Sequence, residues 1–460
     1  MAVWSVVRIS ELEGAKRLDA EYYRPEYLEA TNQLIRFGVG PLGNFISDIR
    51  YGIYTEPDYL ELGTDFIRAL NLEEVDVQGD ILKVRPDVVP SPKYFLSPGD
   101  LLVVRSGANV GNSGVIIDRF SEATFGSYTI RLRFNPSINP YVAYVFLKSK
   151  FGRFQTIRFR TGLAQPNINI PNLKLLRITT RFSSSFQDDV ESLVKQTHQE
   201  IIHSENLYIQ AEQMVLQEVG WEELKLSQPK YWTVPLSRAQ QVDRLDAEHF
   251  QPKYDKLIAH LKRTGKAKQI RDVLAEPIQK GVTPDYDLNG QIVVINSQHL
   301  GRHNLNFEDT DRTTEVFWRA NKRAQIRQDD VMIYATGAYI GRTNAYLESA
   351  SSLAGVDILL VRPTKDCHPL YLAVFLNALP GLLQSKKFSS GSGQAHIYPA
   401  YVSSYWIYIP SHVFQQKVAD FVRQSYSARQ KAKALLEKAK RAVEIAIEQG
   451  QKNAMAFLNT

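Results

Sequence analysis

The sequence has almost no cysteine and no long apolar run. Cys367 is the single cysteine of 460 residues, which excludes an internal disulfide and a zinc site with several cysteine ligands. We interpret it as a partly buried small residue in a protein of the reducing cytoplasm. No run of about 18 apolar residues predicts a membrane-spanning helix. The stretch from Met1 to Ile9 has no small-residue cleavage signature, so no signal peptide is expected.

Motifs for chemistry on nucleotides are also missing. No Gly-x-x-x-x-Gly-Lys-Ser/Thr phosphate loop is present, and Thr264-Gly265-Lys266 reads as a turn. Asn139-Pro140-Tyr141 lacks the second proline with which adenine methyltransferases hold a flipped base, and it is predicted to begin a helix. The nine histidines do not have the spacing of metal ligands on one helix. We therefore expect no catalytic residue, metal site or cofactor in this chain.

Charge alone says little about partners. The net charge of +6 and the isoelectric point near 9.0 are a mild excess for a chain of this length. Since one hydrophobic core stops growing at about 250–300 residues, the length predicts two or three domains.

The dominant feature is an internal duplication. Residues 17–27 read RLDAEYYRPEY, and residues 244–254 read RLDAEHFQPKY, an offset of 227. Further matches follow in the same order at offsets of 228 to 230. They include Gly107-Ala-Asn-Val-Gly111 with Gly337-Ala-Tyr-Ile-Gly341, Val145-Phe-Leu147 with Val374-Phe-Leu376, Gln165 and Ile168 with Gln394 and Ile397, and Phe186-Gln187 with Phe414-Gln415. Such an ordered series predicts two copies of one module.

Each copy has the composition of an α+β module. Runs of β-branched and aromatic residues predict strands at 101–104 and 128–134, and at 331–334 and 358–361 in the second copy. A glycine loop lies between the paired strands, and helices are predicted afterwards, at 141–150 and 370–379. The fold class is therefore expected to be α+β.

A long polar helix is predicted at the end of each copy. Positions spaced by four and three residues from Val190 to Val215, and again from Val418 to Val443, form a mostly small or apolar series. This heptad spacing predicts a coiled-coil seam. We expect two antiparallel helices of about 30 residues, roughly 45 Å long, that separate the modules around a pseudo-twofold axis. Two unrelated surface helices are the alternative.

The expected organisation has four parts. A first module (1–185) is followed by a spacer helix (186–220), a second module (221–413) and a second spacer helix (414–460). Two copies of one recognition module on a stiff spacer would suit a DNA target with two separated half-sites, as a symmetric dimer suits a palindromic DNA site. Because the loops of the two modules differ, the half-sites are expected to differ too.

Over essentially its full length the chain resembles the specificity (S) subunits of type I restriction-modification systems. The resemblance rests on RLDAEYYRPEY and RLDAEHFQPKY, SGANVGNSG and TGAYIGRTNA, the Gln-x-x-Ile loops, and FQDDV and FQQKV. It implies two target-recognition domains that each read a few base pairs of a split site. It also implies two methyltransferase (M) subunits, which bind S-adenosylmethionine and methylate adenine. Restriction (R) subunits that use ATP and Mg complete the implied complex, in which this chain is not an enzyme.

Loops in both modules have the composition that reading DNA requires. Arg or Lys suits guanine, Asn or Gln suits adenine, small or aromatic groups suit the thymine methyl, and cations or hydroxyls suit phosphates. The candidates in the first module are Tyr54, Thr55, Arg68, Asn71, Arg105, Asn109, Asn112, Arg158, Arg160, Gln165 and Asn167. Those in the second are Lys280, Thr283, Asn296, Gln298, His299, Thr336, Tyr339, Arg342, Asn344, Lys386, Lys387, Gln394 and His396. The alternatives are turn geometry for the glycines and a solvated surface for each polar residue.

These observations predict a DNA-binding specificity subunit that reads an asymmetric bipartite site and docks M and R subunits. One alternative is a self-contained DNA modification or restriction enzyme. Another is a DNA-bridging protein without sequence preference. The basic positions of the last helix are interpreted as a solvated face, with partner binding as the alternative; they are Lys431, Lys433, Lys438, Lys440 and Arg441.

Overall fold

A computed structural model of the chain describes residues 6–9, 17–54, 58–60, 62–73, 75, 77–107, 109–120, 122–162, 165–226, 229–307, 310–391 and 394–460. The chain forms two compact units. Unit 1 comprises Met1–Ile201 with Arg429–Thr460, and unit 2 comprises Ile202–Ala428. The boundary falls inside both long helices, so this division differs from the expected one of two modules and two whole spacer helices. The reason is that each half of a long helix shares the core of the unit in which it lies.

Unit 1 contains three sheets. The first has the antiparallel order β2 (Ile46–Tyr51), β9 (Thr129–Phe134), β6 (Leu101–Val104), β7 (Ser113–Val115). The second has the order β3 (Tyr59–Leu60), β5 (Leu82–Val84), β4 (Thr64–Ile67), β8 (Thr124–Phe125), in which β4 and β8 are parallel. The third pairs β1 (Gly40–Pro41) with β10 (Arg177–Ile178).

Unit 2 repeats this plan. Its first sheet is β12 (Gln279–Lys280), β19 (Ile358–Val361), β16 (Val331–Tyr334), β17 (Thr343–Ala345). Its second is β14 (Arg312–Thr313), β13 (Ile292–Ile295), β18 (Ser352–Ala354), β15 (Gln325–Ile326), again with one parallel pair, and its third pairs β11 (Ala267–Gln269) with β20 (Trp406–Tyr408). The four predicted strands are confirmed as β6, β9, β16 and β19. The second sheets differ at their edges, so the two copies diverge there.

The helices of the modules also correspond. Unit 1 contains α1 (Pro25–Phe37), α2 (Pro140–Lys148), α3 (Lys150–Phe159) and α4 (Ile170–Leu175). Unit 2 contains their equivalents α7 (Pro252–Arg263), α9 (Pro369–Asn377), α10 (Leu379–Phe388) and α11 (Pro399–Ser403), together with α6 (Leu236–Val242) and α8 (Glu315–Ala320). The helices predicted at 141–150 and 370–379 are confirmed as α2 and α9.

Asn139 is the N-cap of α2. Its side-chain oxygen accepts hydrogen bonds from the backbone N–H groups of Tyr141, at 2.9 Å, and Val142, at 3.3 Å. Pro140 occupies the first helical position, where its missing N–H costs nothing. The Asn-Pro-Tyr sequence is therefore a helix start, as predicted.

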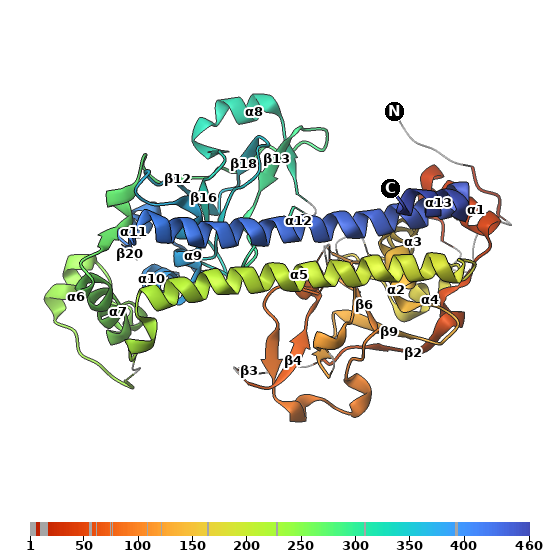
Figure 1. The fold of residues 1–460 in the computed structure, drawn as a ribbon, viewed down its shortest axis with the longest axis horizontal. Coiled ribbons are helices and arrows are strands. Elements are labelled where there is room, and N and C mark those ends of the chain that lie inside the picture. The colour runs from red at the N-terminus through yellow and green to blue at the C-terminus, as the bar shows by residue number, and fades with distance from the viewer. Residues whose placement is uncertain are drawn as a thin grey trace. The chain divides into compact units, whose positions relative to one another are not determined.

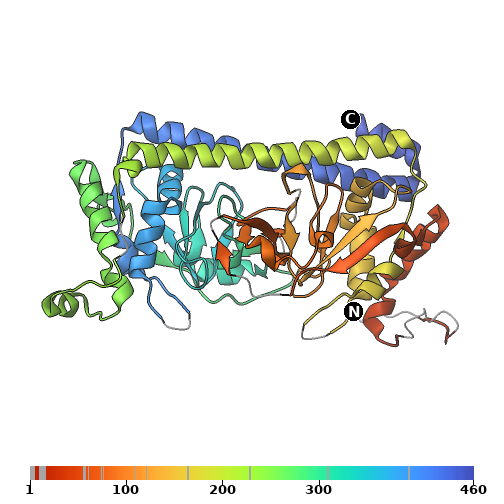
Figure 2. The same cartoon turned by 90° about the horizontal axis from the view of Figure 1, so that it is seen from below.

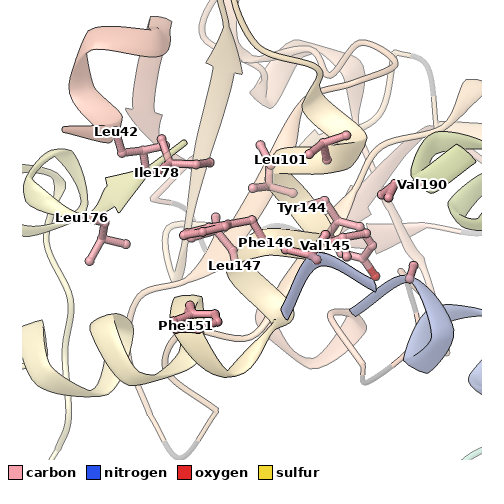
Figure 3. Packing of buried hydrophobic residues seen from close by; sticks show 14 of the residues in the cluster. Leu42, Leu101, Tyr144, Val145, Phe146, Leu147, Phe151, Leu176, Ile178 and Val190 are labelled. Atoms are coloured by element: carbon pink, nitrogen blue, oxygen red, sulfur yellow. The ribbon is translucent and has the colours of Figure 1, made fainter. Parts of the chain in front are cut away.

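The core of unit 1 lies between its first sheet and the helices α2 and α3. Figure 3 shows Leu101 of β6, Phe146 of α2 and Phe151 of α3 in one cluster of buried side chains. Val190, from the first long helix, belongs to the same cluster. The corresponding cluster of unit 2 includes the buried thiol of Cys367, and burial raises the pKa of that thiol to about 12. Cys367 was expected to be a partly buried small residue, and the structure buries it fully.

The long helices α5 (Ser184–Glu218) and α12 (His412–Gln449) pack antiparallel within each unit (Figure 1). In unit 1 the Thr197 hydroxyl lies 3.5 Å from the carbonyl oxygen of Ala432. In unit 2 the Ser425 hydroxyl donates to the carbonyl oxygen of Ser204 at 2.8 Å. At the repeat offset of 228 residues, 197 corresponds to 425 and 204 to 432, so both units make the same contact. The predicted seam is confirmed.

Both long helices exceed the predicted length of about 30 residues. They have 35 and 38 residues, or roughly 52 and 57 Å at about 1.5 Å per residue. A shorter helix, α13 (Gln451–Leu458), follows Gly450. Within the part of the chain that the structure describes, no helix combines the length and apolar character that a membrane span requires.

Candidate nucleic-acid interface

The glycine loop of each module connects two antiparallel strands, β6 with β7 and β16 with β17. Gly107 and Gly111 have φ angles of 100° and 91°, and Gly337 and Gly341 have 116° and 89°. Glycine adopts this left-handed region at little cost, whereas other residues are strained there. Turn geometry therefore explains the glycines themselves.

The second glycine of each loop also permits close packing. A Cβ atom at Gly111 would lie 2.2 Å from Cγ2 of Thr156 in α3, and one at Gly341 would lie 2.5 Å from Cβ of Ser385 in α10. Thr156 and Ser385 are equivalent positions of the duplication. Each glycine loop is thus pressed against a helix of its own module.

A second loop is attached to each glycine loop by backbone hydrogen bonds. In unit 1 the N–H of Ile168 donates to the carbonyl of Arg105 at 2.8 Å, and the N–H of Gly107 donates to that of Pro166 at 3.2 Å. The equivalent bonds in unit 2 join Ile397 to Ala335 at 2.8 Å and Gly337 to Ala395 at 2.9 Å. We call these the paired loops: 105–112 with 161–167 in unit 1, and 335–342 with 390–396 in unit 2.

Side chains link the paired loops as well. The Asn167 amide donates to the hydroxyl of Ser106, and in unit 2 the Thr336 hydroxyl lies 3.1 Å from Nδ1 of His396. Figure 2 shows the second loop of each unit, yellow in unit 1 and blue in unit 2, on the side of its module away from α5 and α12. Each module therefore presents one pair of loops that are hydrogen-bonded to each other.

Many of the predicted contact residues reach solvent. Tyr54 is 92% exposed. The other exposed candidates are Asn109, Gln165, Lys280, Thr283, Gln298, Lys386 and Gln394. Partly exposed are Arg68, Arg105, Asn112, Arg160, Asn167, Asn296, Tyr339, Arg342 and His396. Thr55 lies outside the described residues.

Arg158 and Lys387, at equivalent positions, are buried instead. The Arg158 Nε donates to the carbonyl of Tyr22 at 2.9 Å, and its guanidinium lies 4.1 Å from the centre of the Tyr22 ring. The Lys387 ammonium donates to the carbonyl of His249 at 3.3 Å, and burial lowers the pKa of this lysine although Asp255 opposes the shift. Since Tyr22 and His249 are also equivalent, both cations hold the same segment of their module. Both were predicted to contact DNA, and the structure shows them enclosed within their modules.

Asn71 and His299 are a second equivalent pair with a structural role. The Asn71 side-chain oxygen accepts a hydrogen bond from the N–H of Arg68, and Nδ1 of His299 accepts one from the N–H of Asn296, both at 2.9 Å. Both side chains are buried. They cap a 3-10 turn in each module and are committed to the backbone.

Asn344 and Thr336 are also buried. The Asn344 amide donates to the carbonyl of Gly301 at 2.8 Å, and Thr336 is the partner of His396 described above. Burial and these internal hydrogen bonds remove both side chains from the surface that a duplex could contact.

The RLDAE motif has a role that its sequence did not reveal. Arg17 pairs with Asp19 at 2.6 Å and donates to the carbonyl of Arg160 at 2.9 Å, at the end of α3. Arg244 pairs with Asp246 at 2.7 Å and donates to the carbonyl of Ser389, at the end of α10, also at 2.7 Å. A cation at a helix C-terminus satisfies carbonyls that lack helical partners. The motif therefore links the start of each module by hydrogen bonds to the residues where its second loop begins.

The basic face of α12 carries ion pairs. Lys431 pairs with Glu200 of α5 at 2.5 Å, Lys440 pairs with Glu437 at 2.6 Å, and Arg441 lies 3.3 Å from Glu444. Lys431 and Arg441 are exposed, and Lys433, Lys438 and Lys440 are partly exposed, which agrees with a solvated face. Among the described residues, no cluster of three or more His, Cys, Asp or Glu side chains could hold a metal ion.

Comparison with solved structures found chains that are similar to this one over most of its length. The S subunit of a type I restriction-modification system from M. genitalium matches 91% of this chain and 95% of its own, with 14% identity and a TM-score of 0.34. The chain is similar to type I specificity subunits.

Two further structures match over comparable lengths. The HsdS subunit from Thermoanaerobacter tengcongensis matches 92% of this chain and 95% of its own, with 13% identity and a TM-score of 0.27. A chain from a study of complex assembly and conformational transition of the type I R-M system matches 92% of this chain and 96% of its own, with 13% identity and a TM-score of 0.28. No protein-family model and no curated protein matches the sequence.

Proposed function

We propose that this chain is the DNA-binding specificity subunit of a type I restriction-modification complex and reads an asymmetric bipartite site, one half with each module. The observation that carries the proposal is the duplication of the paired loops. Their backbone attachments are the same in both modules, while the side chains that they present are different. A scaffold repeated with altered contact residues is suited to two similar but unequal targets.

The exposed and partly exposed loop side chains have the chemistry of base recognition. The first module offers Arg105, Asn109, Asn112 and Gln165, and the second offers Tyr339, Arg342, Gln394 and His396. In the major groove, guanidinium groups match the acceptors of guanine, and amides match the donor and acceptor of adenine. The half-sites would therefore have different sequences.

Cations near these loops would contact the phosphate backbone. Lys280 of β12 and Lys386 of α10 are exposed, and Arg160 at the end of α3 is partly exposed. Each phosphate contact releases condensed counterions, so affinity falls with salt. We expect steep salt dependence for both specific and non-specific DNA.

The long helices would set the gap between the half-sites and provide docking surfaces for M and R subunits. In this proposal the M subunits bind S-adenosylmethionine and each receives a flipped adenine, and the R subunits use ATP and Mg. This chain supplies sequence choice and no catalytic group.

Co-expression with the neighbouring methyltransferase followed by methylome sequencing tests the proposal. We expect methylated adenines in two short, unlike motifs at a constant separation, and no methylation without the methyltransferase. Methyl transfer by this chain alone, with S-adenosylmethionine added, would contradict the proposal and favour a self-contained enzyme.

A competition assay separates sequence reading from bridging. Specific readers bind their site about 10³-fold or more tightly than bulk DNA. The S–M complex should be displaced from a duplex bearing the methylated motif only by that motif. Equal displacement by random duplex would instead support a DNA-bridging protein.

A further inference from the structure

The backbone of Arg105 is hydrogen-bonded on both sides in the candidate interface of unit 1. It lies between the end of β6 and Gly107. Its N–H donates to the carbonyl of Tyr128 at 2.9 Å, and its own carbonyl accepts from the N–H of Ile168 at 2.8 Å. Both backbone groups are therefore satisfied, and the base of the side chain has a fixed position and direction.

The guanidinium group is also positioned by an aromatic ring. Its central carbon lies 4.5 Å from the centre of the Tyr51 ring. Tyr51 is the last residue of β2, and its hydroxyl accepts a hydrogen bond from the N–H of Ile170 at 3.2 Å. Because this ring is anchored at both ends, stacking on it restricts the rotation of Arg105.

Among the described residues, no carboxylate forms an ion pair with Arg105, and its enclosed Nε has no hydrogen-bond acceptor. An enclosed donor without an acceptor is unfavourable in the free protein. A ligand that supplies planar acceptors beside the ring would satisfy the guanidinium.

We propose that Arg105 reads one guanine of the half-site bound by the first module, an inference that rests on the proposed function. Guanine offers O6 and N7 in the major groove at the spacing of two guanidinium N–H donors. The guanidinium is planar by itself, and the stack with Tyr51 holds it in one orientation before DNA arrives. Little conformational freedom is then lost on binding, which favours a specific contact over a loose charge interaction.

The second module cannot make this contact at the equivalent position. Ala335 occupies it with the same backbone attachments: its N–H donates to the carbonyl of Asp357, and its carbonyl accepts from the N–H of Ile397, both at 2.8 Å. A methyl group replaces the guanidinium there. The half-site bound by the second module is therefore an internal control for any change at Arg105.

Methylome sequencing of S–M complexes with Arg105→Ala tests this. One guanine in one half-motif is expected to become degenerate, with discrimination against other bases reduced about 5- to 150-fold. The other half-motif should be unchanged. Arg36→Ala is the matched control, since Arg36 is an exposed arginine of α1 away from the paired loops.

Arg105→Gln provides a second test, which depends on a changed base preference and not on a loss of base discrimination. An amide at this position should shift the preference from guanine toward adenine, whose N6 and N7 it matches. If Arg105→Ala fails to fold, methylation is lost at both half-motifs together. The Arg105→Gln variant then tests whether Arg105 reads the guanine.

Two results would overturn the inference while leaving the proposed function intact. One is a wild-type motif without a guanine in either half. The other is an unchanged methylated motif in both variants together with lower affinity for every DNA sequence. In that case the slope of log affinity against log salt concentration would fall by about one, which is the signature of a phosphate contact. A wild-type complex without any bipartite motif would contradict the proposed function itself.

Discussion

Arg158 and Lys387 illustrate how one buried position serves both modules. Each is a cation at the end of the helix that precedes the second loop, and each donates to the carbonyl of the equivalent residue, Tyr22 or His249. Arg158 also donates to the Thr31 hydroxyl at 3.2 Å. A cation enclosed in this way stabilises the module only while its partners remain in place.

Removing the Arg158 side chain should therefore affect stability and leave specificity intact. We expect Arg158→Ala to lower the free energy of unfolding by about 2–4 kcal/mol, because hydrogen bonds from a charged donor and buried packing are lost together. The measurement is denaturant unfolding, with Arg160→Ala as the partly exposed control. A stable Arg158→Ala protein with an altered methylated motif would return this residue to the interface.

His249 gives the second module a pH dependence that Tyr22 does not give the first. Burial lowers the pKa of His249, and the positive charges of Lys387 and Arg244 act in the same direction. The unfolded chain therefore binds a proton at this imidazole more tightly than the folded chain does. The stability contribution is complete above the unfolded value of about 6.5 and is lost as pH falls through the folded pKa.

We expect His249→Phe to reduce the loss of stability of unit 2 between about pH 7.5 and pH 5. Denaturation midpoints at both pH values measure this, with the exposed His412→Gln as the control. Some dependence should remain, because burial and Arg423 also lower the pKa of His368. An identical pH profile in wild type and His249→Phe would contradict the assignment.

The same residues show what sequence can predict at this scale. Composition singled out polar loops, and the exposed Asn109 and Gln394 lie in them. It could not separate these from Asn71 and His299, because a polar side chain that caps its own backbone has the same composition as one that faces solvent. The stacking of Tyr51 on Arg105 was not predictable from composition, because it is a contact across 54 positions of sequence.

At the scale of elements, strands and long helices were predictable because their periodicity is local. The start of α2 was predictable for the same reason, from Asn139 and Pro140. The break between α2 and α3 at Ser149 was not. It brings Gly152 against the backbone of Leu147, where a Cβ would lie 2.3 Å from the Leu147 Cα. That close approach depends on packing that no local pattern encodes.

The two glycines of the first glycine loop give a matched pair of substitutions. A Cβ at Gly111 meets Thr156 at 2.2 Å, while one at Gly107 meets no atom within 4 Å, and both residues have positive φ. Gly107→Ala should cost about 1–2 kcal/mol from backbone strain alone. Gly111→Ala should cost roughly a further 1–3 kcal/mol from overpacking. Denaturant unfolding of the two variants measures the difference, and equal costs would show that the loop does not press on α3.

At the scale of the whole molecule, the duplication predicted a repeated module and an antiparallel helical pair. It did not predict that the boundary between compact units falls within α5 and α12. A heptad seam identifies the face by which a helix packs, but it carries no information about which half of the helix joins which core. Thr197 with Ala432 and Ser204 with Ser425 are the same seam contact, yet they belong to different units.

A helical spacer predicts that the gap between half-sites follows helix length. Four residues inserted after Ile201 in α5 and four after Ala428 in α12 preserve the antiparallel register and add about 6 Å to each helix. At about 3.4 Å per base pair, the gap in the methylated motif should grow by one or two, with both half-motifs unchanged. The control is a four-residue insertion after Lys230, an exposed position outside the helices, which should leave the gap as it is. If methylome sequencing finds the original gap in the double insertion, the long helices do not determine the separation of the half-sites.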